Sequence, residues 1–167
     1  MSVRSYKGIK AITLLTFVAF ALSACDAGLK SEADLRQQFF QNKEPLFQIL
    51  QMQRHDAKVI RIAPSFTRLE NNWNWPRKDI GLSEERWNSY RELFGKAGIA
   101  DGIQNDDGCL FYFVSSVGLA VSGTSRGFVF TQKPLENVVK NFDECPAGKD
   151  PCYVPLDGPW YLFTWST

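Results

Sequence analysis

Histidine is nearly absent from this sequence, since His55 is the single histidine among 167 residues. The zinc-protease helix needs two histidines four residues apart, so that class of enzyme is excluded. The glycine-rich phosphate loop and the dinucleotide-binding fingerprint are also missing. We therefore expect neither a metal nor an organic cofactor.

Neither sign of charge dominates, because 19 basic residues stand against 18 acidic residues and give a formal net charge of +1. Nucleic-acid recognition needs a concentrated basic surface that releases counterions. The composition therefore predicts no nucleic-acid partner. Repeats, low-complexity tracts and domain linkers are missing as well, which is typical of a single domain.

A hydrophobic run long enough to span a membrane is lacking too. The apolar stretch from Ala11 to Ala21 is shorter than the roughly 20 residues of a spanning helix. It follows basic residues, namely Arg4, Lys7 and Lys10, which is the pattern of an export signal. The stretch ends at Leu22-Ser23-Ala24-Cys25, which resembles the lipobox of bacterial lipoprotein signal peptides. This resemblance implies that residues 1–24 form a signal peptide that is removed and that Cys25 then carries the lipid.

The resemblance also makes predictions about location. A mature chain of 143 residues would have a formal charge of −2, and residues 25–30 would form a short lipidated tether. The five residues from Asp26 to Lys30 span at most about 17 Å, so we expect the domain at 31–167 to lie close to the membrane. Asp26 resembles the inner-membrane retention signal of enteric lipoproteins. We expect a lipid-anchored protein of the cell envelope that faces the periplasm, with the inner membrane favoured over the outer.

Three further cysteines are Cys109, Cys145 and Cys152. Cys145 and Cys152 bracket a turn-rich loop, and disulfides form in an oxidising compartment, so we expect these two to be joined. Cys109 would then be a free thiol. A zinc site is the alternative, but these cysteines and His55 lack the usual close ligand spacing.

Two helical regions are indicated by apolar periodicity. The first runs from Ser31 to about Asp56, with Pro45 marking either a kink or the start of a second helix. The second begins after the N-cap Ser83 and ends at Gly98, where Ile99 would contact Phe94 in a Schellman motif. Pro134 is typical of a helix first turn and predicts a third, short helix before the cysteine loop.

The remaining segments favour β-structure. Strands are expected at Val59–Ile62, over Cys109–Ser115 and Val117–Val121, and around Phe128–Phe130, with turns supplied by Gly118 and by Gly123 to Gly127. Asp157-Gly158 is a strong hairpin signal before Trp160. This order predicts one α+β domain in which an antiparallel sheet of about five strands packs two or three helices on one face.

No catalytic group is expected. Gly123-Thr124-Ser125-Arg126-Gly127 matches the nucleophile-elbow pattern, but a strand follows it and His55 precedes it, contrary to the order of α/β-hydrolases. Adjacent acidic residues point apart on a helix or strand and make no acid–base pair. His55 is interpreted as a favourable cation at a helix end. We therefore predict that the protein is not an enzyme.

A binding surface is the alternative to catalysis. Trp73 and Trp75 lie two residues apart beside Arg77 and Lys78, so an extended chain would place both rings on one side with cationic neighbours. Tryptophan and arginine are enriched at interface hot spots. The competing interpretation is that these rings fill the edge of the core.

The stretch from Asn72 to Trp165 looks like a group of uncharacterised proteobacterial lipoproteins. The resemblance is carried by Trp73-x-Trp75-Pro76-Arg77, Gly81-Leu82-Ser83-Glu84-x-Arg86-Trp87, Gly118-Leu119-x-Val121-Ser122-Gly123, Arg126-Gly127-Phe128, Lys133-Pro134-Leu135 and Gly158-Pro159-Trp160-Tyr161-Leu162. It implies a stable exported domain and no particular active site. We expect a non-catalytic module that binds another periplasmic or envelope protein, as an immunity protein, inhibitor or assembly accessory. A peptidoglycan or glycan binder is the alternative, and a hydrolase of unrecognised type is a further one.

Overall fold

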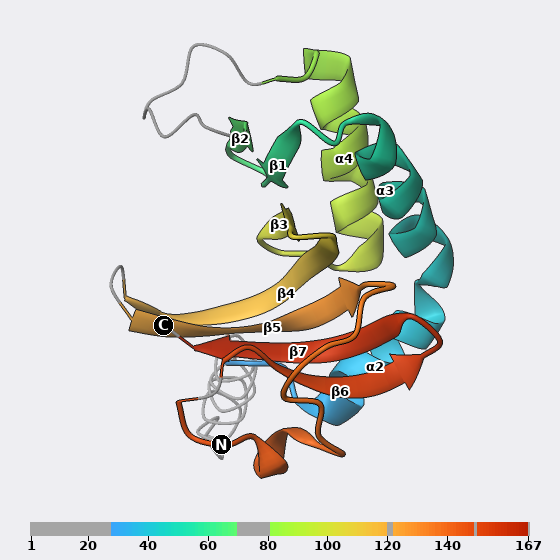
Figure 1. Ribbon diagram of the computed structural model, residues 1–167. Coiled ribbons are helices and arrows are strands. Elements are labelled where there is room, and N and C mark those ends of the chain that lie inside the picture. The colour runs from blue at the N-terminus through green and yellow to red at the C-terminus, as the bar shows by residue number, and fades with distance from the viewer. Residues whose placement is uncertain (1–27, 70–80, 120–121, 149, 167) are drawn as a thin grey trace, which may run out of the picture.

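A seven-stranded antiparallel sheet organises the protein (Figure 1). The computed structural model describes residues 28–69, 81–119, 122–148 and 150–166. The strand order is β2-β1-β3-β4-β5-β7-β6, and every pair of neighbours is antiparallel. The strands are β1 (Val59–Ile62), β2 (Thr67–Leu69), β3 (Gly102–Asp106), β4 (Cys109–Leu119), β5 (Ser122–Phe130), β6 (Cys152–Asp157) and β7 (Trp160–Ser166).

Three α-helices occur in the described part of the chain: α2 (Glu32–Gln41), α3 (Lys43–His55) and α4 (Glu84–Ala97). The region predicted at 31–56 is therefore two helices, and Pro45 lies in the first turn of the second, where its missing N–H costs no helical hydrogen bond. The predicted ends of α4 are confirmed. Ser83 accepts a hydrogen bond from the Arg86 amide, Gly98 has a φ of 68°, and the Ile99 amide donates to the Phe94 carbonyl at 2.9 Å.

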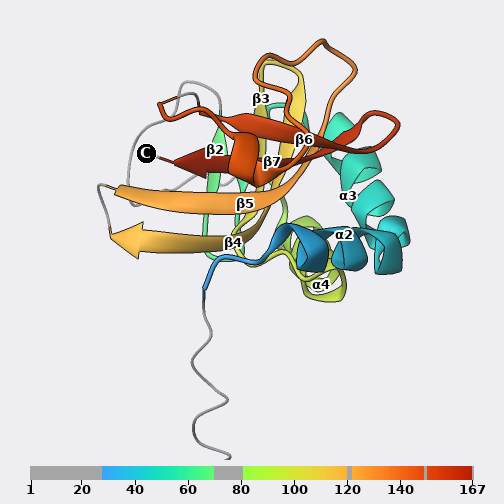
Figure 2. The same ribbon diagram turned by 90° about the horizontal axis from the view of Figure 1, so that it is seen from below.

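The helices pack on one face of the sheet, called here the helix face; the opposite face is the outer face. Figure 2 shows α2 and α4 on one side of β4, β5 and β7. The core between helices and sheet is centred on Trp160, which is 1% exposed and whose ring centroid lies 5.3 Å from those of Phe39 and Tyr112. The Tyr112 hydroxyl donates to the Leu46 carbonyl in α3 at 3.2 Å. Aromatic burial and this hydrogen bond together fix the helices on the sheet.

The outer face carries a second, smaller aromatic cluster. Phe111, Phe113, Val129, Tyr153 and Phe163 are buried there, with Leu135 and Trp165 packed against them. Because successive side chains of a strand point to opposite faces, β4 serves both clusters. Tyr112 faces the helices, and its neighbours Phe111 and Phe113 face outward.

The connection between β5 and β6 protects the last strand of the sheet. The Val139 amide donates to the Tyr153 carbonyl at 2.8 Å, and the Tyr153 amide donates to the Asn137 carbonyl at 3.1 Å. An edge strand left bare would offer its unpaired backbone groups to another chain. Here the connection occupies that edge of β6 instead.

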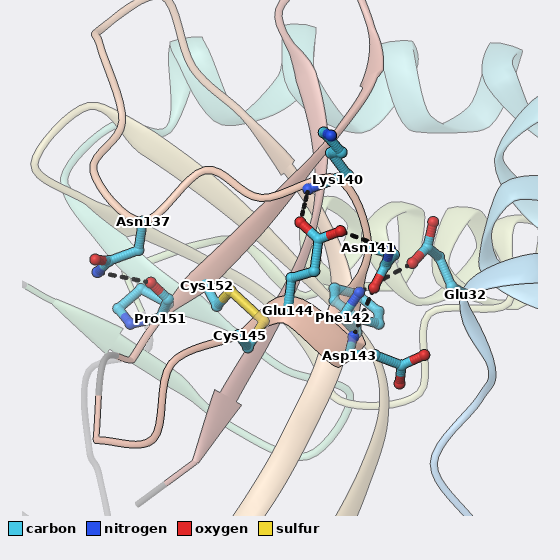
Figure 3. Close-up of a disulfide and its surroundings, with 10 residues drawn as sticks. All are labelled: Glu32, Asn137, Lys140, Asn141, Phe142, Asp143, Glu144, Cys145, Pro151 and Cys152. Carbon is cyan, nitrogen blue, oxygen red and sulfur yellow. Dashed lines mark hydrogen bonds between the residues drawn. A yellow bond between two sulfur atoms is a disulfide. The ribbon is translucent and has the colours of Figure 1, made fainter.

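The predicted disulfide between Cys145 and Cys152 is present, and Cys109 is free (Figure 3). The bond ties the end of the 3-10 helix Phe142–Glu144 to the first residue of β6. The same turn is held from the other side by α2, because the Phe142 amide donates to the Glu32 carboxylate at 3.1 Å.

The α+β class with one domain is confirmed, and three local predictions are wrong. The sheet has seven strands instead of about five, since β2 and β3 went unpredicted. Residues 123–127 are not turns but part of β5, where Gly127 pairs with Phe113 and any side chain would collide with the Tyr112 carbonyl. The helix predicted after Pro134 is also missing, because Val138 bridges to Tyr153 and the next helical residues are Phe142–Glu144.

Candidate functional site

A cleft lies on the outer face of the sheet. Its volume is about 690 Å³, within the range of small-molecule and peptide sites. It crosses six neighbouring strands, from β2 and the loop that joins it to β1, over β3, the second half of β4 and the first residues of β5, to the end of β7. We call it the Arg61 cleft, after the cation in its wall.

Arg61 reaches the outer face because its strand neighbour Ile62 is fully buried on the helix face. Its Nη2 donates to the Asp101 carbonyl at 2.8 Å. Its guanidinium carbon lies 4.2 Å from the Phe113 ring centroid and 6.0 Å from that of Phe66, so aromatic rings flank the cation. The fold therefore holds a mostly buried positive charge in the wall of the cleft.

Arg61 is not fully satisfied by its surroundings. Its Nη1 atom is buried and has no hydrogen-bond partner among the described residues. Arg61 also makes no ion pair within 4.0 Å in that part of the chain. Burial lowers the pKa of Arg61 to about 10; the Asp101 charge acts in the opposite direction and the Arg68 charge lowers this pKa further. The group remains a cation at neutral pH.

Hydroxyl groups and one indole ring form the opposite side of the cleft. Ser116 of β4 and Ser125 of β5 face each other across the strands, with their Oγ atoms 2.9 Å apart. Trp165 packs on Phe111 with ring centroids 5.7 Å apart and also lines the cleft. The cleft thus combines a cation, hydroxyls and aromatic surface.

The nucleophile-elbow pattern places its serine on a turn between a strand and a helix. Ser125 lies instead within strand β5. It pairs with Trp165 of β7, and its hydroxyl contacts another serine. His55 lies at the end of α3 and does not line the cleft, although Ser125 does. Among the described residues, no group of three or more histidine, cysteine or acidic side chains is placed to hold a metal ion.

Several predicted site residues lie outside the described residues. Cys25 and Asp26 of the lipidation and sorting signals are among them. So are the four residues of the candidate binding surface, Trp73, Trp75, Arg77 and Lys78. These assignments stay predictions. Within the described residues, no helix has both the length and the apolar composition needed to cross a membrane.

The sequence analysis missed the Arg61 cleft. Its residues come from β1, β2, β3, β4, β5 and β7 and show no local motif. One local signal was present in the sequence. Arg61 stands among apolar residues in a short strand, next to a core position, and charged residues are rarely placed there without a specific role. In comparisons with family models, curated proteins and solved structures, this chain matched none of them.

Proposed function

We propose that this protein is a non-catalytic, lipid-anchored module of the bacterial cell envelope that binds a segment of another envelope protein in the Arg61 cleft. The lipid on Cys25 holds it to a membrane, and the domain faces the periplasm. Asp26 favours the inner membrane over the outer. The supporting observation is the cleft itself, in which a desolvated cation, hydroxyls and aromatic rings are grouped without a catalytic arrangement. Buried arginine and aromatic residues are the usual anchors of protein interfaces.

The contacts of Lys30, at the start of the domain, support this proposal because they show on which face of the sheet a tether would begin. The Lys30 amide donates to Ser115 Oγ at 3.0 Å, and Arg126 Nη1 donates to the Lys30 carbonyl at 3.1 Å. Arg126 is on the helix face, where its guanidinium lies 4.9 Å from the Phe142 ring centroid.

The cleft and this attachment use opposite faces of the same hairpin, β4–β5. Ser116 and Ser125 line the cleft, and the next residues on each strand, Ser115 and Arg126, hold Lys30 on the other side. Figure 2 shows the start of the described chain on the side of α2 and α4. A tether of about 17 Å from Lys30 would keep the helix face toward the membrane. The cleft would then open toward the periplasm, where a partner protein can reach it.

Site-specific crosslinking in cells tests this function. A photo-crosslinking phenylalanine analogue at Ser116 lies in the cleft, and the same analogue at Ala33, exposed on α2, is the matched control. We expect one defined protein to be crosslinked from position 116 and not from position 33. The adduct should disappear with Arg61→Gln and persist with Lys140→Gln, which removes a charge from an exposed position outside the cleft. Equal crosslinking from both positions, or an adduct that ignores Arg61→Gln, contradicts the proposal.

A glycan ligand is the second candidate, and Trp165 beside the hydroxyls of Ser116 and Ser125 is the observation that favours it. Sugars stack on aromatic faces and form hydrogen bonds at their edges. Cosedimentation with purified peptidoglycan separates the two candidates. Retention on the sacculus that is lost with Trp165→Ala, together with no protein adduct at position 116, would replace the protein partner by a glycan.

A further inference from the structure

Packing alone does not account for the positive charge of Arg61 in the wall of the cleft. A guanidinium that is moved out of water loses hydration. In the folded protein Arg61 gains one hydrogen bond to a backbone carbonyl and contact with two aromatic rings. No carboxylate of the described residues lies within ion-pair distance. A buried charge is normally paired. Because Arg61 has neither an ion-pair partner nor an acceptor for its buried Nη1 among the described residues, a ligand can supply both.

We infer that the Arg61 cleft recognises a carboxylate group carried by a peptide segment of the partner. This inference rests on the proposed function and adds the chemistry of the ligand. Arginine pairs with carboxylates through short, charge-assisted hydrogen bonds. The hydroxyls of Ser116 and Ser125, across the cleft, can donate to or accept from the amide groups on either side of that carboxylate.

The carboxylate of Asp101 in the same cleft favours a singly charged ligand over a phosphate group. Among the described residues, the charged side chains that line the cleft are Arg61, Arg68 and Asp101. A phosphate group near its second ionisation would carry almost two negative charges, and Asp101 would repel it more strongly than it repels a single carboxylate.

Binding requires a local adjustment of Arg61. Its Nη1 is covered in this conformation, so the guanidinium must turn toward the cleft before that N–H can meet a ligand oxygen. Such rotamer changes are common at interfaces whose backbone stays fixed. The Nη2 bond to the Asp101 carbonyl provides the pivot.

Matched short peptides test the inference by NMR titration of the full chain. The probes are acetyl-Ala-Asp-Ala-amide and acetyl-Ala-Asn-Ala-amide, which differ only in the carboxylate, and acetyl-Ala-Ala-Ala with a free C-terminus. We expect shifts of the backbone amides at Asp101, Ser116 and Ser125. A carboxylate probe should bind at least about tenfold more tightly than the Asn peptide, the size of one charge-assisted hydrogen bond. The two carboxylate probes distinguish a side chain from a chain terminus.

Variants assign the effect to the cleft. Arg61→Gln should abolish the preference for the carboxylate, and Arg61→Lys should restore part of it. Asp101→Asn keeps the backbone carbonyl that holds Nη2 but removes a negative charge, so it should tighten carboxylate binding several-fold. Asp143→Asn, exposed on the 3-10 helix outside the cleft, is its charge control and should change nothing. The Asp101 arm keeps the test decisive if Arg61→Gln fails to fold.

Four results would overturn the inference: equal binding of all three peptides, no binding of any, weaker binding by Asp101→Asn, or inorganic phosphate binding more tightly than either carboxylate. N-acetylmuramic acid, a sugar carboxylate, serves as a further probe. Its binding without either peptide would assign the carboxylate to a glycan. A crosslink at position 116 that persists while the peptides fail would leave the protein-binding function standing and remove only the carboxylate.

Discussion

The helix face of the sheet is covered by α2, α3 and α4, whereas the outer face is covered in part by the β5–β6 connection and leaves the Arg61 cleft open. Both faces are rich in aromatic rings. On the helix face the Tyr112 hydroxyl donates to the Leu46 carbonyl of α3. On the outer face the rings flank a cation. The same residue type therefore fills a core on one side and lines an open cleft on the other.

Two tryptophans of β7 lie on opposite faces of the sheet, and replacing one of them has the largest expected effect. Trp160 is buried on the helix face, and Trp165 is half-buried at the cleft. Trp160→Ala should lower the free energy of unfolding by about 3–5 kcal/mol, because it leaves a large cavity. Trp165→Ala should cost about 1–2 kcal/mol, because less apolar area is lost. Urea unfolding of both variants measures the difference, and equal losses would contradict the division into a core face and a binding face.

The disulfide should have the next largest effect. Replacing Cys145 and Cys152 together by Ala should lower the free energy of unfolding by about 2 kcal/mol, since the bond closes a short loop. Cys109→Ala, which removes the free thiol of the outer-face cluster, is the control and should change stability less. Thermal melts with and without reductant provide the measurement. A reductant effect on the double variant would show that another pairing exists.

The N-cap of α4 should contribute about 1 kcal/mol. Ser83→Ala removes the oxygen that accepts from the Arg86 amide at 3.2 Å. Ser89→Ala is the matched control, because that hydroxyl bonds only to the Glu85 carbonyl within the same helix and alanine is the better helix former. We expect the first variant to melt earlier and to keep its carboxylate affinity at the cleft. Altered affinity would mean that the two faces are coupled.

Alkaline titration of the tyrosines also compares the two faces. Of the predictions made here, it has the smallest expected effect on stability. Burial raises the pKa of Tyr153, on the outer face, to about 12, with the neighbouring Cys109 and Asp106 adding to the shift. Burial raises the pKa of Tyr112, on the helix face, well above 10. The folded protein favours the neutral phenol, so this stabilisation is complete below pH 10 and is lost as the pH rises through 12.

Absorbance at 295 nm follows the phenolates. We expect Tyr153 to ionise in the folded protein and Tyr112 to ionise only when the protein unfolds. Tyr153→Phe should remove the earlier step alone. If Tyr112 ionised first, the helix face would be the more accessible of the two.

The elements of this fold were predictable where a signal is local. The caps of α4 at Ser83 and Gly98, the proline in the first turn of α3 and the Asp157-Gly158 hairpin each depend on backbone geometry that one or two residue types prefer. Strand β3 was missed although Asp107-Gly108 carries the same turn signal, with φ values of 44° and 79°.

Glycine was the main source of error in the strands. Gly123 and Gly127 were predicted as turn residues because glycine often permits one. In the structure Gly127 lies in β5, where the Tyr112 carbonyl approaches too closely for any side chain. That need arises from the pairing of β5 with β4, which the residues around Gly127 do not specify.

Local sequence was sufficient to predict the α+β class, the two ends of α4, one hairpin and the pairing of Cys145 with Cys152, because each depends mainly on residues near in the chain. The lipobox pattern at Cys25 stays a prediction. The Arg61 cleft, in contrast, arises from the tertiary structure. Its cation, its hydroxyls and Trp165 come from strands that are distant in sequence, and the order in which a sheet pairs its strands brings them together. Long-range pairing depends on the sum of many weak contacts over the whole core, and no single motif encodes that sum.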